Sequence, residues 1–406
     1  MVEARDGSRT LTLSIGGKRR IAFILDPETW LGGVNYFRNL IQALAILPDP
    51  KTLPIIFTGE SNAKLLEGFP STSAVRTRAM DRGTFPWWSR KLVGKVLAGD
   101  WFLDRLLRGH DIDLISHRAP LTTFSSIPAV GWIPDFQHVH LPELFSAQEL
   151  RARDREFMRM CEECAKVIVS SECALSDLRA FSPRHAAKGE VLHFVANPAN
   201  GAAATPTPQL RQSFDLPEHY FLLPNQFWVH KNHRVVITAL KVLKQRDKRA
   251  VVLATGSTRD HRQPGHFDSL LNYAQECGVL DRFRVLGIVP FADLSGLMRD
   301  AVALINPSLF EGWSTSVEEA KSLGKRMLLS DIPVHREQAP ELGGYFSPDD
   351  ASGLADLMQR SLVEFDPQSD EDAREKARTQ LSGRQVEFAR AYERIVTPRL
   401  FGVTGH

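Results

Sequence analysis

Short apolar segments alternate with longer amphipathic segments along most of the chain, and this alternation restricts the fold more than any other feature. Segments 21–25 (I-A-F-I-L) and 53–57 (L-P-I-I-F) are apolar throughout, and a helical pattern over about 34–47 separates them. A continuous short apolar run predicts a strand that is buried on both faces, and such strands occur in parallel sheets covered by helices. The alternation therefore predicts an α/β protein whose parallel strands are joined by crossover helices.

The alternation is interrupted once. Residues 197–217 contain four prolines and a run of small residues, which is typical of a linker. The chain, at 406 residues, is long enough for a domain on each side. We expect two Rossmann-like domains, 1–204 and 205–380, facing a cleft into which the carboxyl ends of the strands point. The charged, periodic segment 370–397 predicts a terminal helix, and we expect 381–406 to cross back onto the N-terminal domain.

Charge and cysteine usage exclude several classes of protein. The 50 basic and 48 acidic residues give a net charge of +2, which argues against a nucleic-acid partner. Four cysteines are too few for a disulfide framework in a chain of this length and favour a cytoplasmic location. The polar first ten residues predict no signal peptide. No run approaches the ~18 apolar residues of a spanning helix, so any membrane contact is expected at the inner membrane surface.

Segment 85–108 stands apart from the alternation because aromatic and basic residues are interleaved in it. Trp87, Trp88, Trp101 and Phe102 lie among five Lys and Arg residues. Such an amphipathic segment can lie in a membrane interface, and it can equally form a helical hairpin that packs its aromatics on the first domain. The sequence leaves both interpretations open.

Segment 310–326 (F-E-G-W-S-T-S-V-E-E-A-K-S-L-G-K-R) carries the most specific chemistry. Ser316 and Glu319 have the spacing of a capping box, which alone would make Glu319 structural. That interpretation leaves Glu311 unexplained, together with the backbone amides of 313–317 at the carboxyl end of a strand. A helix N-terminus there is an anion site suited to phosphate, and flanking carboxylates suit hydroxyl groups. The pattern indicates a ligand with the layout of a sugar nucleotide.

The stretch E-G-W-S-T-S-V-E-E resembles the E-x7-E motif of retaining glycosyltransferases of family 4. Segments 289–312 and 324–337 resemble the donor half of that family, and segments 32–40, 132–138 and 169–178 resemble its acceptor half. The resemblance covers most of the chain and implies the GT-B fold. It implies that Glu311 binds donor-sugar hydroxyls and Glu319 the ribose. The diphosphate would face the amides of Gly312, Trp313, Ser314, Thr315, Ser316 and Val317.

Segment 225–233 (N-Q-F-W-V-H-K-N-H) follows the first strand of the second domain. Lys231 matches the Lys of the family's Arg…Lys phosphate pair and would stabilise the leaving diphosphate. The Arg position is Gln226 here, which can donate a hydrogen bond but carries no charge. Either Lys231 acts alone, or Arg259 or His230 assists it.

Five further residues are candidates by position. Gly32 and Gly33 allow close backbone approach, and in the family this loop lies beside the donor phosphate and the acceptor, although a plain tight turn explains the glycines equally well. Asp135 follows strand 130–133, and Pro134 stands where the family often has a His. His138 is the substitute by proximity, with a structural role as the alternative. Base contacts are expected from the backbone near Val289.

Two patterns imitate metal sites. Cys161-x-x-Cys164 has no second cysteine pair nearby, whereas structural zinc normally needs four ligands. Asp111 and Asp113 precede a strand and therefore lie at the edge away from the cleft. We expect no metal and no cofactor beyond the nucleotide-sugar co-substrate.

The resemblance implies a retaining, metal-independent hexosyltransferase. Its donor would be a nucleotide-diphosphate sugar, with GDP-mannose as one candidate, and its acceptor a saccharide or a lipid-linked saccharide in surface polysaccharide or lipopolysaccharide synthesis. Two alternatives stay open. One is a nucleotide-sugar epimerase on the same fold. The other is a catalytically silent scaffold in a polysaccharide-assembly complex, which the departures at Gln226 and Pro134 keep open.

Overall fold

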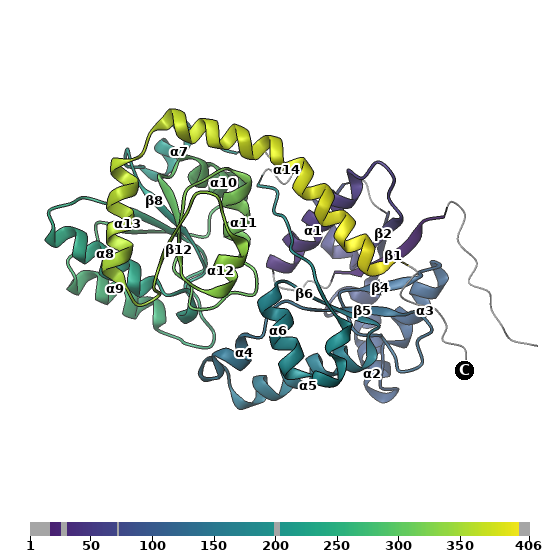
Figure 1. Cartoon of the computed structure of the whole chain (residues 1–406). Coiled ribbons are helices and arrows are strands. Elements are labelled where there is room, and N and C mark those ends of the chain that lie inside the picture. The colour runs from purple at the N-terminus through teal and green to yellow at the C-terminus, as the bar shows by residue number, and fades with distance from the viewer. Residues whose placement is uncertain (1–16, 26–30, 71–72, 199–203, 398–406) are drawn as a thin grey trace, which may run out of the picture.

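The structure, a computed structural model, describes residues 17–25, 31–70, 73–198 and 204–397. Two parallel sheets, each covered by helices on both faces, lie side by side (Figure 1). This arrangement confirms the predicted α/β class and the two Rossmann-like domains.

The first sheet has seven strands in the order β3-β2-β1-β4-β5-β6-β7. Its strands are β1 (Arg19–Ile24), β2 (Thr52–Thr58), β3 (Ser73–Arg76), β4 (Leu114–Ser116), β5 (Ala129–Ile133), β6 (Lys166–Val169) and β7 (Gly189–Val191). Its helices are α1 (Leu31–Ala45), α2 (Phe85–Val96), α3 (Trp101–Gly109), α4 (Gln137–His140), α5 (Ala147–Glu163) and α6 (Glu172–Phe181).

The second sheet has six strands in the order β10-β9-β8-β11-β12-β13. Its strands are β8 (Phe221–Pro224), β9 (Val252–Thr255), β10 (Phe283–Gly287), β11 (Ala303–Asn306), β12 (Met327–Ser330) and β13 (Gly343–Phe346). The helices are α7 (Thr207–Phe214), α8 (His233–Gln245), α9 (His266–Glu276), α10 (Phe291–Asp300), α11 (Thr315–Ser322), α12 (Pro333–Gln338), α13 (Ala351–Val363) and α14 (Pro367–Val396).

Strand β1 shows why the short strand segments are apolar at every position and do not alternate with polar residues. Ile21 and Phe23 pack into the core on the α1 side of the sheet, whereas Ala22 and Ile24 pack into the core on the opposite side. Successive residues of a strand point to opposite faces, and both faces of this sheet are covered, so each position must be apolar. Burial of one such large side chain contributes about 2 kcal/mol.

The order of the strands also locates the ligand-binding edges. In both sheets the chain starts in the middle, runs to one edge, and returns to the other side of the first strand. The reversals fall between β1 and β4 and between β8 and β11. Crevices at the carboxyl ends of strands at such reversals are the ligand sites of open α/β sheets.

Helix α14 joins the two domains. It starts on the second domain, where Asp370 accepts a hydrogen bond of 2.8 Å from Lys325, and it ends on the first, where Tyr392 donates to Ser116 at 2.7 Å. Figure 1 shows it as the yellow helix that runs across the top of both domains. The predicted return to the N-terminal domain is thus confirmed, and the helix begins at Pro367, well before residue 381. Residues 398–406 lie outside the described residues.

Segment 85–108 forms the helical hairpin of α2 and most of α3. Leu103 and Leu107 of α3 are buried in the core of the first domain, so α3 fixes the hairpin. Helix α2 instead leaves its aromatic face in solvent: Phe85 is 85% and Trp88 62% exposed. The expectation that the hairpin packs its aromatics on the domain is therefore wrong for α2. None of the described helices has the length and apolar character needed to cross a membrane.

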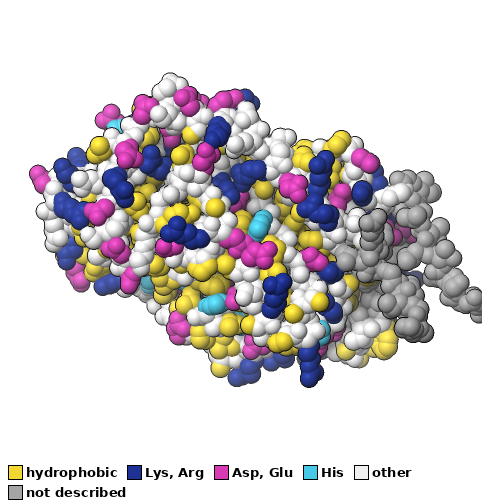
Figure 2. All heavy atoms as spheres, viewed as in Figure 1, with side chains coloured by type: hydrophobic (Ala, Val, Ile, Leu, Met, Phe, Trp, Pro, Cys, Tyr) yellow, Lys and Arg dark blue, Asp and Glu magenta, His cyan; other side chains and the backbone are white. Residues whose placement is uncertain are grey.

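Charges of both signs are intermingled on the surface. Figure 2 shows Lys and Arg interspersed with Asp and Glu over the visible face, with no extended patch of one sign. This distribution agrees with the near-zero net charge and gives no footprint for a nucleic acid on that face.

Candidate functional site

A cavity of about 260 Å³ lies between the two domains, at the β8/β11 reversal of the second sheet. The first domain contributes residues that follow β5, including Pro134 and Asp135. The second domain contributes the segments 224–231 and 310–316 together with Glu319. We call this the interdomain cavity. Ten of the residues predicted to bind or react line it: Asp135, Gln226, Lys231, Glu311, Gly312, Trp313, Ser314, Thr315, Ser316 and Glu319.

Lys231 and Glu311 form an ion pair in the cavity wall. The Lys231 ammonium donates to Glu311 Oε1 at 2.6 Å, and Ser308 Oγ donates to the same oxygen at 2.7 Å. Lys231 is held by the turn before α8, where Asn232 adopts a left-handed conformation (φ 52°) and donates to the carbonyls of Pro307 and Pro348. Among the described residues that line the cavity, Lys231 is the only Lys or Arg.

The charge state of Glu311 follows from its surroundings. Burial by itself opposes ionisation, but Lys231, His335 and the Ser308 hydrogen bond together outweigh it and lower the pKa of Glu311 to about 2. Glu311 is therefore a carboxylate and Lys231 its counter-ion at neutral pH. An anionic carboxylate accepts hydrogen bonds only, which suits a ligand rich in hydroxyl groups.

The N-terminus of α11 points its amides at the same cavity. The helix begins at Thr315, and the hydroxyls of Ser314 and Ser316, which could cap it, accept hydrogen bonds from the buried Asn306 amide at 2.8 and 3.3 Å. Ser314 makes no capping hydrogen bond. Within the described chain, the amides of Thr315, Ser316 and Val317 consequently have no acceptor. Unpaired amides at the positive end of a helix dipole bind anions such as phosphate.

Glu319 lies one turn further along α11 and also lines the cavity. No residue of the described chain donates a hydrogen bond to its carboxylate, and burial raises the pKa of Glu319 to about 7. The capping-box interpretation is wrong, because Ser316 is inside the helix and its hydroxyl faces Asn306. The neighbouring acid, Glu318, is buried on the opposite side and pairs with Arg384 of α14. Glu318 therefore ties α11 to α14, and Glu319 faces the interdomain cavity.

Gly312 and Trp313 form the contact between the domains beside the cavity. A Cβ atom on Gly312 would lie 2.2 Å from the Pro134 carbonyl oxygen, so the position admits only glycine without displacement of the backbone. The Trp313 indole donates to the Phe194 carbonyl at 3.2 Å and stacks on His193 at 4.5 Å between ring centroids. These contacts fix the width of the cavity.

His230 and Arg259 were predicted to assist Lys231, but neither brings a positive charge into the cavity. His230 lines the cavity, but burial and then Lys231 lower the pKa of its imidazole to about 3, so the ring is neutral at physiological pH. Arg259 is exposed and does not line the cavity. Gln226 lines it, and its side-chain oxygen accepts from the Ser257 amide at 2.8 Å, which leaves its amide NH₂ for a ligand.

Some predicted site residues lie elsewhere. His138 does not line the cavity: it is buried against Phe157, and its Nε2 lies 3.1 Å from Asp154. The packing therefore favours the alternative interpretation, in which His138 has a structural role. The Val317 side chain is fully buried in the second domain, so Val317 can contribute only its backbone amide, and the Val289 side chain packs against the same core. Gly32 and Gly33 lie in the first turn of α1, and Gly33 lines a different cavity. Cys161 and Cys164 are buried free thiols, and no metal-binding group of three His, Cys, Asp or Glu occurs in the described ranges.

Three residues outside the predicted set lie on the first-domain side, and two of them line the interdomain cavity. Tyr36 and Trp132 stack at 4.6 Å between centroids and both line the interdomain cavity. The Tyr36 hydroxyl bonds to His117 Nε2 at 2.9 Å, and Ser116 bonds to the other ring nitrogen at 2.7 Å. His117 directly follows the predicted strand 113–116, and its place at a strand's carboxyl end is the signal that could have identified it.

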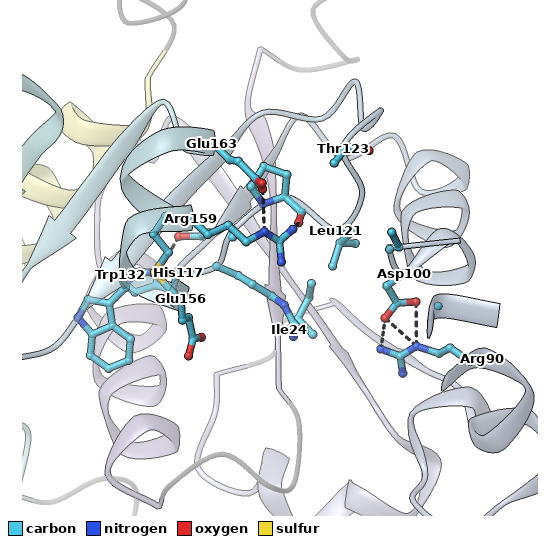
Figure 3. Close-up of a pocket in the computed structure, with 18 of the residues that line it drawn as sticks. Ile24, Arg90, Asp100, His117, Leu121, Thr123, Trp132, Glu156, Arg159 and Glu163 are labelled. Carbon is cyan, nitrogen blue, oxygen red and sulfur yellow. Dashed lines mark hydrogen bonds and ion pairs between the residues drawn. The ribbon is translucent and has the colours of Figure 1, made fainter. Parts of the chain in front are cut away.

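A second, larger cavity of about 740 Å³ lies at the β1/β4 reversal of the first sheet, and we call it the first-domain cavity (Figure 3). It is lined by the ends of β1, β4 and β5 and by parts of α2 and α5. Trp132 lines both cavities.

Residues 208–380 match the family model described as "Glycosyl transferases group 1". The O-antigen chain mannosyltransferase RfbU of Salmonella typhimurium is 32% identical over 133 residues, and the match spans about a third of each chain: 33% of this one and 35% of that one.

Two solved structures share the whole fold. A glycosyltransferase from Rickettsia africae has a TM-score of 0.65 at 15% identity, with 94% of this chain and 99% of that chain covered. Anabaena Alr3699/HepE, solved with UDP and glucose, has a TM-score of 0.67 at 17% identity, with 92% and 98% covered. The second domain of this chain thus matches the group 1 glycosyltransferases, and the two domains together have the GT-B fold of these solved structures.

Proposed function

We propose that this chain is a retaining, metal-independent glycosyltransferase of family 4 that transfers a hexose from a nucleotide-diphosphate sugar. The observation that carries the proposal is the convergence of three features in one cavity: the Lys231–Glu311 pair, the unpaired amides of α11, and the unpartnered carboxylate of Glu319. A cation and helix amides suit a diphosphate, and the two acids suit the hydroxyl groups on either side of it. No single one of these features would identify the ligand.

In this proposal each group has a separate task. The α11 amides and Lys231 bind the diphosphate and stabilise the charge that grows on it as it leaves. Glu311 accepts hydrogen bonds from the transferred sugar, and Glu319 accepts them from the ribose. The acceptor oxygen attacks the anomeric carbon on the face from which the diphosphate departs. The carbon–oxygen bond to the phosphate breaks, and the acceptor's hydroxyl proton passes to a diphosphate oxygen.

GDP-mannose is the first donor to test. RfbU is named as a mannosyltransferase, and HepE was solved with UDP-glucose, so both guanine and uracil nucleotides belong in the comparison. The acceptor is proposed to be a saccharide or lipid-linked saccharide of a surface polysaccharide or lipopolysaccharide, at the cytoplasmic face of the membrane. A WaaG structure described as a lipopolysaccharide glycosyltransferase shares the fold at 15% identity.

A thermal-shift panel with GDP-, UDP- and dTDP-sugars tests the donor site. Binding at 100 times Kd stabilises a protein by about 2.7 kcal/mol, so one nucleotide is expected to raise the unfolding midpoint clearly above the others. The Glu311→Gln variant should lose the sugar-dependent part of that shift. If no nucleotide sugar shifts the wild-type protein, the proposed donor site is wrong.

A catalytically silent scaffold is the second candidate, because Gln226 and Pro134 depart from the family pattern at two positions that line the cavity. NMR of the donor distinguishes the possibilities. Transfer with retention gives a new glycoside only when an acceptor is present, whereas an epimerase changes the donor without one. A silent scaffold binds the donor and leaves its NMR spectrum unchanged with every acceptor tried.

A further inference from the structure

His117 is a buried ionisable residue to which the proposed reaction gives no task. It directly follows β4 and has a left-handed backbone, with φ of 62°. This conformation is strained for a residue other than glycine, and residues held in it cluster at functional sites. The imidazole packs against the ring of Phe37 at 5.1 Å and that of Trp132 at 5.4 Å between centroids, and Figure 3 shows it beside Trp132.

Four buried side chains form a continuous hydrogen-bonded chain from α14 to the interdomain cavity, and we call it the His117 relay. Tyr392 of α14 donates to Ser116 Oγ at 2.7 Å, and Ser116 Oγ lies 2.7 Å from His117 Nδ1. His117 Nε2 lies 2.9 Å from the hydroxyl oxygen of Tyr36. Tyr36 lines the interdomain cavity and stacks on Trp132, which lines it too.

The His117 relay has a direction because its imidazole is neutral. Burial lowers the pKa of His117 to about 3, so the ring carries a single hydrogen at physiological pH. A neutral imidazole has one N–H donor and one acceptor nitrogen. His117 therefore donates to one of its two hydroxyl neighbours and accepts from the other.

Two observations select the same direction. Ser116 Oγ accepts from Tyr392, and within the described chain the only acceptor for its own hydrogen is His117 Nδ1. The distances agree: 2.7 Å between Ser116 Oγ and Nδ1 is usual for an O–H donor, whereas 2.9 Å between Nε2 and the Tyr36 oxygen is usual for an N–H donor. Nε2 thus carries the imidazole hydrogen and donates to Tyr36.

This direction leaves the hydroxyl hydrogen of Tyr36 for a ligand. The Tyr36 oxygen accepts from His117, and no acceptor for its hydrogen occurs among the residues that the structure describes. Burial, and then the nearby Tyr392, raise the pKa of Tyr36 well above its ordinary value. The hydroxyl therefore keeps its hydrogen, donates it in a hydrogen bond, and does not act as a base.

We propose that Tyr36 is a hydrogen-bond donor of the interdomain cavity and that α14 sets its direction through Ser116 and His117. The Tyr36 hydroxyl donates to an oxygen of the bound sugar nucleotide. Tyr392, Ser116 and His117 are positioning residues, because they act only through Tyr36. The identity of the ligand rests on the proposed function, whereas the direction of the His117 relay is a property of the folded chain.

Nitrogen-15 NMR of the histidine rings in the full chain tests the direction without any ligand. The His117 signals are identified by their loss in His117→Asn and by their displacement in Tyr36→Phe. We expect a hydrogen on Nε2 and none on Nδ1, unchanged between about pH 5 and pH 8 because the pKa of about 3 keeps the ring neutral. A hydrogen on Nδ1 would overturn the proposal, since the available hydroxyl hydrogen would then belong to Ser116, which lines the first-domain cavity.

Tyr392→Phe tests the control from α14. A hydroxyl that accepts a hydrogen bond is polarised into a stronger donor, so without Tyr392 the tautomer ratio of His117 should shift at least about twofold towards Nδ1–H. Tyr220→Phe is the matched control, because it removes another buried tyrosine hydroxyl, which donates to the Leu297 carbonyl at 2.9 Å in the second domain. It should leave the His117 signals unchanged. An unchanged tautomer ratio in Tyr392→Phe would refute the control from α14.

Tyr36→Phe tests the contact with the ligand, because it removes the hydroxyl and keeps the ring that stacks on Trp132. Isothermal titration with GDP-mannose and with GDP, or the matching pair for the nucleotide that the thermal-shift panel selects, should show about fivefold weaker binding. A loss with both ligands assigns the contact to the diphosphate, and a loss with the nucleotide sugar alone assigns it to the sugar.

Unchanged affinity of Tyr36→Phe for both ligands would overturn the proposed contact. Tyr220→Phe again serves as the control, and its affinities should equal those of the wild type. A wild-type protein that binds neither ligand would instead contradict the donor site itself. Because the NMR measurements need no ligand, failure of the His117 relay and failure of the proposed function are distinguishable.

Discussion

At the scale of single residues, the site depends on how each ionisable group is paired. Lys231 neutralises Glu311, whereas Glu319, eight residues further along the chain, has no partner in the described ranges. The two acids of one motif therefore differ in charge state before a ligand arrives: the pKa of Glu311 is about 2 and that of Glu319 about 7. The difference follows from the neighbours and not from the residue type.

Lys231→Ala is expected to lower the transfer rate about 10²- to 10³-fold, because a preorganised cation at the leaving diphosphate is lost. It should also cost stability, since the buried Glu311 loses its counter-ion. Lys325→Ala is the matched control, because it breaks the buried Lys325–Asp370 pair, neither residue of which lines the cavity. Transfer kinetics and thermal unfolding of both variants are compared. If the two variants lost the same fraction of the transfer rate, Lys231 would act only by stabilising the fold.

Glu319→Gln is expected to flatten the pH dependence of stability. Because burial raises the pKa of Glu319 from its ordinary value of 4.5 to about 7, its protonated form stabilises the fold below pH 4.5, and this contribution is lost as pH rises to about 7. The variant should therefore gain stability over the wild type at pH 8 and little at pH 4. The unfolding midpoints of the variant and the wild type at the two pH values check this prediction. If the difference between the two proteins were the same at pH 4 and pH 8, the raised pKa of Glu319 would be contradicted.

At the scale of elements, helix α11 is built to keep its amides available. Asn306, at the end of β11, donates to both serine hydroxyls near the helix start and accepts from Ser308 at 2.7 Å. A serine before a helix ordinarily caps it, and here that hydroxyl is engaged elsewhere. The start of α11 lacks this stabilising capping hydrogen bond, and its first-turn amides are therefore available to a phosphate.

Asn306→Ala is expected to weaken donor binding without altering any residue that contacts the donor. The released Ser314 hydroxyl can then accept from the first-turn amides, so a diphosphate must displace it. Loss of the buried amide should also cost about 1–3 kcal/mol of stability. Isothermal titration with the donor nucleotide is the measurement, and Ser314→Ala in the same background should restore part of the affinity. Unchanged affinity in Asn306→Ala would refute this account of α11.

At the scale of the whole molecule, one carboxylate of the second domain secures the first. Glu337 of α12 accepts from the Glu172 amide at 2.7 Å and the Cys173 amide at 3.3 Å, at the N-terminus of α6, and lies 2.7 Å from His193. Burial opposes its ionisation, but His193 and the two amides lower the pKa of Glu337. This link, Gly312 and Trp313 hold the interdomain cavity closed on one side.

Glu337→Ala is expected to open the cleft, because the α6 amides and His193 lose their shared acceptor. Small-angle X-ray scattering should give a larger radius of gyration for the variant, and transfer should slow more than donor binding weakens. In the wild type the link is present above pH 4.5 and is lost as pH falls through the lowered pKa of Glu337, so acidification should open the cleft too. Glu341→Ala, an exposed acid nearby, is the control.

Periodicity and motif spacing in the sequence were sufficient for the fold and for most of the second-domain wall of the interdomain cavity. Runs such as 21–25 must be strands covered on both faces, and Glu311, the amides after it and Glu319 are close along the chain, so a strand, turn and helix place them together. These predictions need only local geometry and the rule that ligands lie at strand ends.

Tertiary structure alone decided the remaining assignments. His138 and His117 both lie near strand ends, yet the packing of α4 and α5 buries one against Phe157 while the other reaches a cavity wall. Glu318 and Glu319 are adjacent acids, and only the arrival of α14 from far along the chain gives Glu318 an ion pair with Arg384. A side chain's charge state and exposure depend on neighbours brought by distant segments, and a one-dimensional pattern does not contain those neighbours.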